Sequence, residues 1–125
     1  TAWSETYGYA GTLDFIAMVE EEAVITDIKT GKSGAWPDVA LQLSAYANAD
    51  YLIDASGERR PLPQIDAAAV LTVRPDEYRL IPVRLGDDVF DTFKALIEVS
   101  KWEHEVGKTV IGKTPVDPIN TEEVA

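Results

Sequence analysis

Short runs of strand-forming residues alternate with helical patterns along the chain. Residues 8–19 are rich in β-formers and predict a first strand, and residues 23–30 predict a second. Between them, Glu20, Glu21 and Glu22 predict a tight, solvent-exposed turn. Because so short a connection joins neighbouring strands, we expect the two strands to pair antiparallel.

The rest of the chain predicts a helix, two more strands and a second helix. Pro37 suits the first position of a helix and Asp38 its positive end, so this helix is expected to run from Pro37 to about residue 49 or 52. The later segments are a loop over 31–34, a loop over 54–63, strands over 66–74 and 77–85, a helix over 88–106, and an irregular tail over 108–125. Pro82 places the last strand at an edge or a bulge. The order β-β-α-β-β-α predicts an α/β (α+β) fold, a mixed β-sheet flanked by helices.

Composition limits the chemistry that the chain can perform. Its 125 residues suffice for one domain with a core. There is no cysteine and one histidine, which excludes disulfides, cysteine nucleophiles and the usual zinc sites. A bound metal would have oxygen ligands, which favours Mg²⁺ or Mn²⁺. The lack of cysteine fits a cytoplasmic protein. No apolar run approaches the ~18 residues of a membrane span, so we expect no membrane partner.

The net charge of −11, from 22 acidic and 11 basic residues, argues against a nucleic-acid-binding protein. Two considerations weaken that argument. Much of the acid lies in clusters such as residues 20–22, 87–88 and 122–123. A metal-dependent nuclease also carries positive charge in its bound cations.

Acidic and basic residues interrupt two strands that are otherwise dominated by apolar residues. Asp27 and Lys29 are two positions apart, so their side chains project from the same face of the second strand. Asp14 precedes the turn by about as many residues as these follow it, so it is expected opposite Asp27 or Lys29. Two carboxylates, with the backbone carbonyl of Ile28, could bind a divalent metal while Lys29 holds a phosphate or a water. The alternative is an ordinary surface ion pair.

Gln42 and Tyr46 lie one turn apart on the first predicted helix and so share a face. Gln42 could bind a phosphate or a water, and Tyr46 could stack on a base. The alternative is a surface glutamine beside a core tyrosine that keeps its hydroxyl in water.

Taken together, these residues resemble the PD-(D/E)xK nuclease superfamily, in particular its RecB-like, phage-type exonuclease branch. The resemblance covers residues 11–46, in three ordered motifs: Gly11-Thr12-Leu13-Asp14, Asp27-Ile28-Lys29-Thr30 and Gln42-Leu43-Ser44-Ala45-Tyr46. It implies a restriction-endonuclease-like fold and Mg²⁺- or Mn²⁺-dependent hydrolysis of DNA, as an exonuclease of phage or bacterial recombination or repair. DNA and other recombination or repair proteins would be its partners, in the cytoplasm of a bacterium or phage-infected host.

The resemblance also implies roles for individual residues. Asp14, Asp27 and the Ile28 carbonyl would bind the metal, and Lys29 would be the catalytic lysine. The helix motif, Gln42 and Tyr46, would contact DNA near the cut. Weaker candidates for DNA contact are Lys32, Arg59 and Arg60.

The family usually has an acidic residue on an upstream helix. Here Glu5 is the nearest candidate, so the single nuclease-like domain 1–125 is expected to lack an N-terminal helical part. Three alternatives stay open: a non-catalytic nuclease-fold domain that binds a protein or DNA, an acidic protein-interaction module in which the motifs are accidental, and a structure-specific endonuclease.

Overall fold

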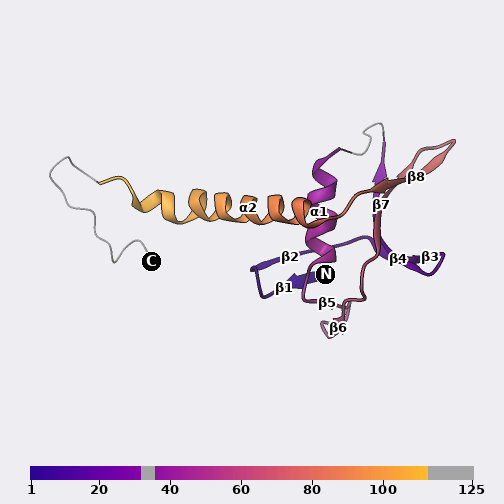
Figure 1. Cartoon of the computed structure of the whole chain (residues 1–125), viewed down its shortest axis with the longest axis horizontal. Helices are drawn as coiled ribbons and strands as arrows, with labels where there is room; N and C mark the ends of the chain where they lie inside the picture. Colours follow the sequence, from indigo (N-terminus) through magenta and orange to yellow (C-terminus); the bar gives the residue numbers. More distant parts are fainter. Residues whose placement is uncertain (32–35, 113–125) are drawn as a thin grey trace. The chain divides into compact units, whose positions relative to one another are not determined.

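The computed structural model describes residues 1–31 and 36–112. Contacts within the chain define two compact units, one over residues 1–93 and one that begins at Lys94. The described residues of the first unit form eight strands in two four-stranded sheets, together with helix α1 (Figure 1). This confirms the predicted mixture of helices and sheets.

The main sheet contains the four strands that the sequence predicts most clearly. Its order is β3 (Phe15–Val19), β4 (Glu22–Thr30), β7 (Ala67–Val73) and β8 (Tyr78–Val83). β4 and β7 are parallel neighbours, and the outer strands pair antiparallel with them. The predicted antiparallel hairpin is therefore confirmed, and so is the edge position of the strand with Pro82, whose missing N–H suits an edge.

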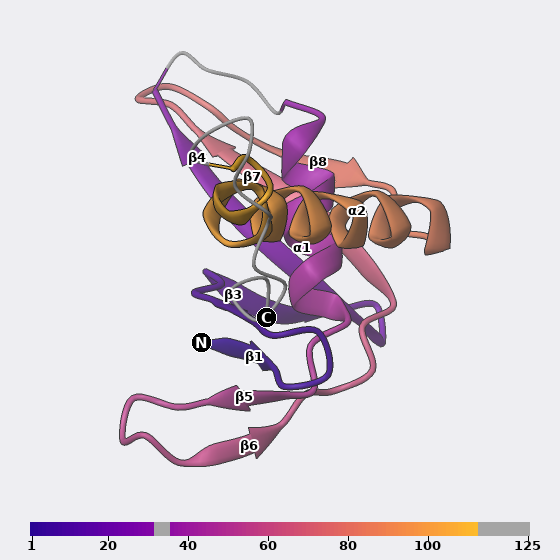
Figure 2. The ribbon, with the colours of Figure 1, turned by 90° about the vertical axis from the view of Figure 1, so that its left-hand side faces the viewer.

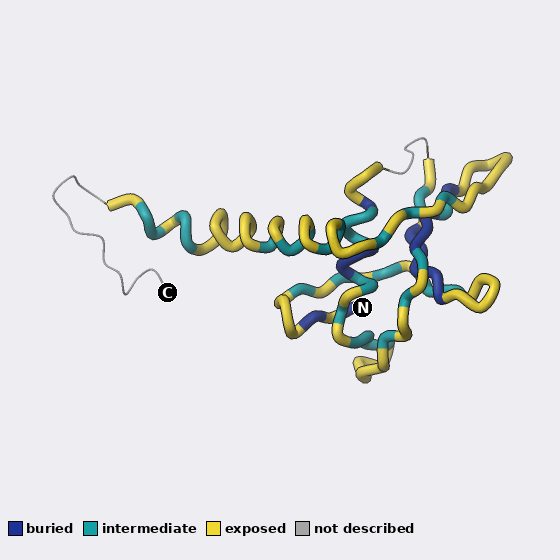
Figure 3. The backbone as a smooth tube through the Cα atoms, viewed as in Figure 1, coloured by how far each residue is buried: buried dark blue, intermediate teal, exposed yellow. Residues whose placement is uncertain are grey.

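Helix α1 (Asp38–Ala47) packs on one face of the main sheet. Along β4, Ile25 lies on this face, and its partner across the parallel ladder is Ala68. The hydrophobic core joins α1 to these two strands and consists of Ile25, Val39, Leu43, Ala68 and Val70. Figure 2 shows α1 alongside β4 and β7, and Figure 3 shows that the buried segments concentrate in these elements and in β1.

A small sheet, which the sequence does not predict, lies at the C-terminal end of α1. All of its strands are antiparallel: β2 (Tyr9–Gly11), β1 (Ala2–Ser4), β5 (Tyr51–Ile53) and β6 (Arg59–Pro61). Ala2 is fully buried at the point where it faces Gly11 in β2 and Leu52 in β5.

Three predicted boundaries are wrong because of this sheet. The strand over 8–19 is interrupted at 12–14, where the chain passes from the small sheet to the main one. The first helix ends at Ala47: Asn48 has a non-helical backbone conformation, its side-chain amide donates to the Ser44 carbonyl, and the chain then pairs with β1. Residues 59–61 of the predicted loop are strand β6.

Helix α2 spans Asp87–His104 and has no fully buried residue. In its first two turns, Phe90 and Phe93 make edge-to-face ring contacts with Tyr7 and Tyr9. The second unit contains the remainder of α2 and the short helix η1 (Val106–Thr109). Of the predicted tail over 108–125, residues 113–125 lie outside the described residues. No helix in the described part of the chain has both the length and the apolar character needed to cross a membrane.

Candidate metal centre

Asp27 and Lys29 project together from β4, as their spacing predicts. The Lys29 Nζ atom lies 3.1 Å from Asp27 Oδ2. Asp27 shares its face with the core residue Ile25 and lies beside Val70 of β7, so the carboxylate stands at the border of the hydrophobic core.

Asp14 lies in the three-residue link between β2 and β3, just before Phe15 pairs with Thr26. Continued by one residue, this register sets Asp14 opposite Asp27. The Asp14 Oδ2 atom accepts a hydrogen bond of 2.7 Å from the backbone N–H of Ile28. The Asp14 carboxylate therefore lies against the backbone that joins Asp27 to Lys29.

The hydrogen bond from Ile28 to Asp14 also shows which side of β4 the Ile28 carbonyl faces. In an extended strand, the N–H and C=O of one residue point to the same side. Because the Ile28 N–H points at Asp14, the Ile28 carbonyl also faces the Asp14 side of β4. The Ile28 side chain projects from the opposite face and is exposed.

The Asp27 carboxylate is buried and incompletely satisfied. The residue is only 7% exposed, and its Oδ2 makes no hydrogen bond. The contact with Lys29 is thus an ion pair without hydrogen-bond geometry. A buried anion is costly unless it is paired and hydrogen-bonded, so an oxygen in this state is suited to act as a ligand of a cation.

Carboxylate and carbonyl oxygens are the type of ligand that a hard divalent cation takes. Two carboxylates and a carbonyl leave several coordination positions to water, as Mg²⁺ prefers. Among the residues that the structure describes, no three Asp, Glu or His side chains converge on one point. A cation here would therefore depend on water and substrate oxygens for the rest of its coordination.

Gln42 and Tyr46 meet on α1, where the Gln42 Nε2 donates a 3.0 Å hydrogen bond to the Tyr46 hydroxyl. The Tyr46 ring lies against the backbone of Gly11 in β2. Two residues earlier, the Tyr9 hydroxyl donates to the Ala45 carbonyl at 2.6 Å. Sequence reasoning missed these contacts between β2 and α1; the glycine of the first motif was their only visible signal.

The weaker DNA-binding candidates lie elsewhere. Arg59, on β6, pairs with Glu5 at 2.9 Å and stacks over the Tyr51 ring. Arg60 pairs with Asp54 at 2.8 Å. Both arginines are therefore held in ion pairs with nearby carboxylates. Lys32 lies outside the described residues.

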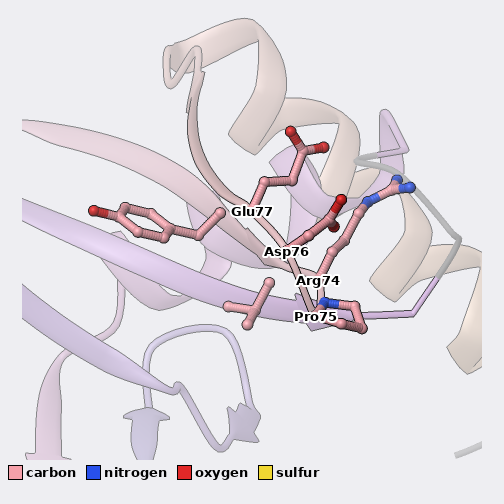
Figure 4. Close-up of a pocket in the computed structure, with 6 residues that line it drawn as sticks. Arg74, Pro75, Asp76 and Glu77 are labelled. Carbon is pink, nitrogen blue, oxygen red and sulfur yellow. The ribbon is translucent and has the colours of Figure 1, made fainter.

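Described residues of the first unit line open hollows in two places, neither of them at the candidate centre. One surrounds the β7–β8 turn, where Arg74, Asp76 and Glu77 project from the chain (Figure 4). The other lies between the start of α1 and the segment that includes Arg84 and Asp88. Neither hollow is lined by Asp14, Asp27, Lys29, Gln42 or Tyr46.

Comparison with protein-family models gave no match, and comparison with curated proteins gave none either. The functional assignment therefore depends on the residues themselves and on their geometry.

Proposed function

We propose that the chain is a Mg²⁺- or Mn²⁺-dependent deoxyribonuclease of the RecB-like exonuclease kind, with a restriction-endonuclease-like fold. The observation that carries the proposal is the buried, unsatisfied Asp27 oxygen beside Lys29, with the Asp14 carboxylate on the adjacent backbone. Phage or bacterial DNA recombination or repair is the role that this activity suits.

Each residue has a defined task in this proposal. Asp14, Asp27 and the Ile28 carbonyl would hold the cation, which when bound polarises a phosphate oxygen and lowers the pKa of a water. Lys29 would move from Asp27 to the scissile phosphate or to the attacking water once the Asp27 charge is shared with the cation. Its ammonium would then stabilise negative charge that develops on the phosphate.

The helix pair would act on the DNA itself. Gln42 has further hydrogen-bonding capacity beyond its bond to Tyr46, so its amide can reach a phosphate or a bound water. Tyr46 offers a ring edge and a hydroxyl beside the backbone of Gly11. These two side chains would orient the strand that is cut.

The test is a cleavage assay with linear and covalently closed circular DNA, with Mg²⁺, Mn²⁺ or a chelator. We expect metal-dependent degradation of linear DNA only, and a loss of about a hundredfold or more in Asp27→Ala and Lys29→Ala. Asp76→Asn, which removes an exposed carboxylate in the β7–β8 turn, is the matched control and should cleave normally. Cleavage with chelator present, or full activity in both site variants, would reject the proposal, and cutting of circular DNA would indicate an endonuclease.

The net charge of −11 favours a second candidate, a non-catalytic domain that keeps this fold to bind a partner. It predicts no metal-dependent cleavage of any DNA substrate. The same assay separates the two.

A further inference from the structure

The Tyr46 ring occupies space that a side chain at position 11 would need. A Cβ built on Gly11 would lie 2.7 Å from Tyr46 Cε1, 3.0 Å from its hydroxyl oxygen and 3.2 Å from Cζ. Carbon atoms in contact are normally about 3.5–4.0 Å apart. Alanine at position 11 and the present position of Tyr46 are therefore incompatible.

Space, and not backbone conformation, requires glycine at this position. Gly11 is a strand residue paired with Ala2, and its φ is not positive. Gly8 and Gly57 show the opposite case, because they have φ values of +72° and +86° and nothing within 4 Å of an added Cβ. Any residue could adopt the Gly11 backbone, but only glycine leaves room for Tyr46.

A second contact fixes β2 against the same turn of α1. Tyr9 lies two positions before Gly11, so both face the helix from one side of the strand. The Tyr9 hydroxyl donates to the Ala45 carbonyl at 2.6 Å, and burial raises the pKa of this hydroxyl above its usual value. With β2 anchored at Ala45, the Tyr46 ring is held between Gly11 and its own helix.

Each partner of the Gly11–Tyr46 contact is linked to another residue of the proposed site. Tyr46 accepts the hydrogen bond from Gln42, and the chain that leaves Gly11 reaches Asp14 three residues later. We infer that Gly11 is a positioning residue whose lack of a side chain sets the Tyr46 ring, and through it the Gln42 amide, relative to the β2–β3 link that carries Asp14. This inference depends on the proposed function for its catalytic consequence, but the placement of Tyr46 can be tested without it.

The placement test is a double-mutant cycle between Gly11→Ala and Tyr46→Ala, measured by urea unfolding and by NMR of labelled tyrosine rings. The Tyr46 ring signals are assigned as those missing from Tyr46→Phe. We expect Gly11→Ala to shift these signals and lower the urea midpoint, and to have no effect on the midpoint in the Tyr46→Ala background. Gly57→Ala, which changes a glycine with a positive φ and no neighbour within 4 Å of an added Cβ, should leave the Tyr46 signals unchanged.

The functional test measures cleavage where every variant is fully folded. Gly11→Ala should reduce the rate about as much as Gln42→Ala, up to about a hundredfold for a displacement of about 1 Å. Combined with Gln42→Ala, it should cause no further loss. A purely structural glycine would lower the urea midpoint and leave the cleavage rate of the folded protein unchanged.

Three results would overturn the inference: unchanged Tyr46 signals in Gly11→Ala, the same drop in urea midpoint with or without Tyr46, or a loss of rate that adds fully to that of Gln42→Ala. If Gly11→Ala does not fold, Gly11→Ala/Tyr46→Ala should restore folding, and its failure to do so also contradicts the inference. If the unmodified protein does not cleave DNA, the proposed function fails, and the ring signals with the urea cycle still decide whether Gly11 places Tyr46.

Discussion

Two buried side-chain oxygens in the described part of the chain make no hydrogen bond, and they have different meanings. Asp27 Oδ2 lies 3.1 Å from Lys29 Nζ, on the strand whose Ile28 N–H donates to the Asp14 carboxylate. Ser44 Oγ belongs to a fully buried residue of α1, where no described partner accepts or donates a hydrogen bond. The spacing of charges on β4 pointed to the first oxygen. Nothing in the sequence distinguishes Ser44 from an ordinary small helix residue.

Ser44→Ala should stabilise the protein, because it removes a buried hydroxyl that has no partner. Ser4 is the matched control: it is also buried, but its Oγ accepts the Tyr7 N–H at 3.1 Å. We expect Ser44→Ala to raise the free energy of unfolding by up to about 1 kcal/mol and Ser4→Ala to lower it by about 1 kcal/mol. Urea unfolding of both variants measures the effect, and a destabilising Ser44→Ala would show that its hydroxyl is satisfied in solution.

Asp54 should give the small sheet a local dependence on acid pH. Bonds from the Ser56 hydroxyl, then from Arg60 and the Glu58 N–H, lower its pKa from 3.8 to about 2. A carboxyl whose folded pKa is depressed stabilises the fold above its unfolded pKa, and this contribution is lost as the pH falls through the folded value. The difference in urea midpoint between the unmodified protein and Asp54→Asn should therefore be constant above about pH 5 and shrink toward pH 2. A difference that does not change with pH contradicts this account.

At the scale of elements, long segments were predictable and short ones were not. β4, β7, β8 and both helices show their periodicity over six or more residues, so their positions follow from the sequence. The strands of the small sheet have three residues each, too few to show a period, and they pair across distances such as Ala2 to Leu52. Only tertiary pairing defines such strands.

Substitutions in the β3–β4 turn should raise the free energy of unfolding. Val19 pairs with Glu22, so Glu20 and Glu21 form a two-residue loop, with φ values of 49° and 71°. Hairpin loops with two positive φ values favour Asn-Gly, because glutamate is strained there. Glu20→Asn/Glu21→Gly should raise the free energy of unfolding by about 1 kcal/mol.

The control for that variant is Glu20→Gln/Glu21→Gln, which removes the same charges and keeps the backbone strain. Urea unfolding should show a smaller gain in this control. Equal gains would mean that charge repulsion among the glutamates, and not their conformation, limits the hairpin.

At the scale of the whole molecule, charge opposes the proposed substrate. With 22 acidic and 11 basic residues, the chain repels DNA unless cations intervene.

The candidate site was predictable where its residues lie on one element: a period of two paired Asp27 with Lys29, and a helical turn paired Gln42 with Tyr46. The contact of Gly11 with Tyr46 was not predictable, because it joins two elements whose packing no local pattern specifies.

DNA binding should therefore require the metal. In Lys29→Ala, which is expected to bind without cutting, fluorescence anisotropy of a labelled linear oligonucleotide should show affinity with Mn²⁺ and none with a chelator. Adding Asp27→Asn should abolish the metal-dependent binding although it removes a negative charge, whereas adding Asp76→Asn, which removes the same charge, should not. Equal affinity with metal and with chelator would show that binding occurs at another surface.

The most direct measurement of the central claim is the anomalous scattering of manganese in crystals soaked with Mn²⁺. The account predicts a peak between the side chains of Asp14 and Asp27, about 2.1 Å from carboxylate oxygens of both residues, and no such peak in Asp27→Asn crystals. A peak confined to other acidic groups, or no peak between these two side chains at saturating Mn²⁺, would contradict it.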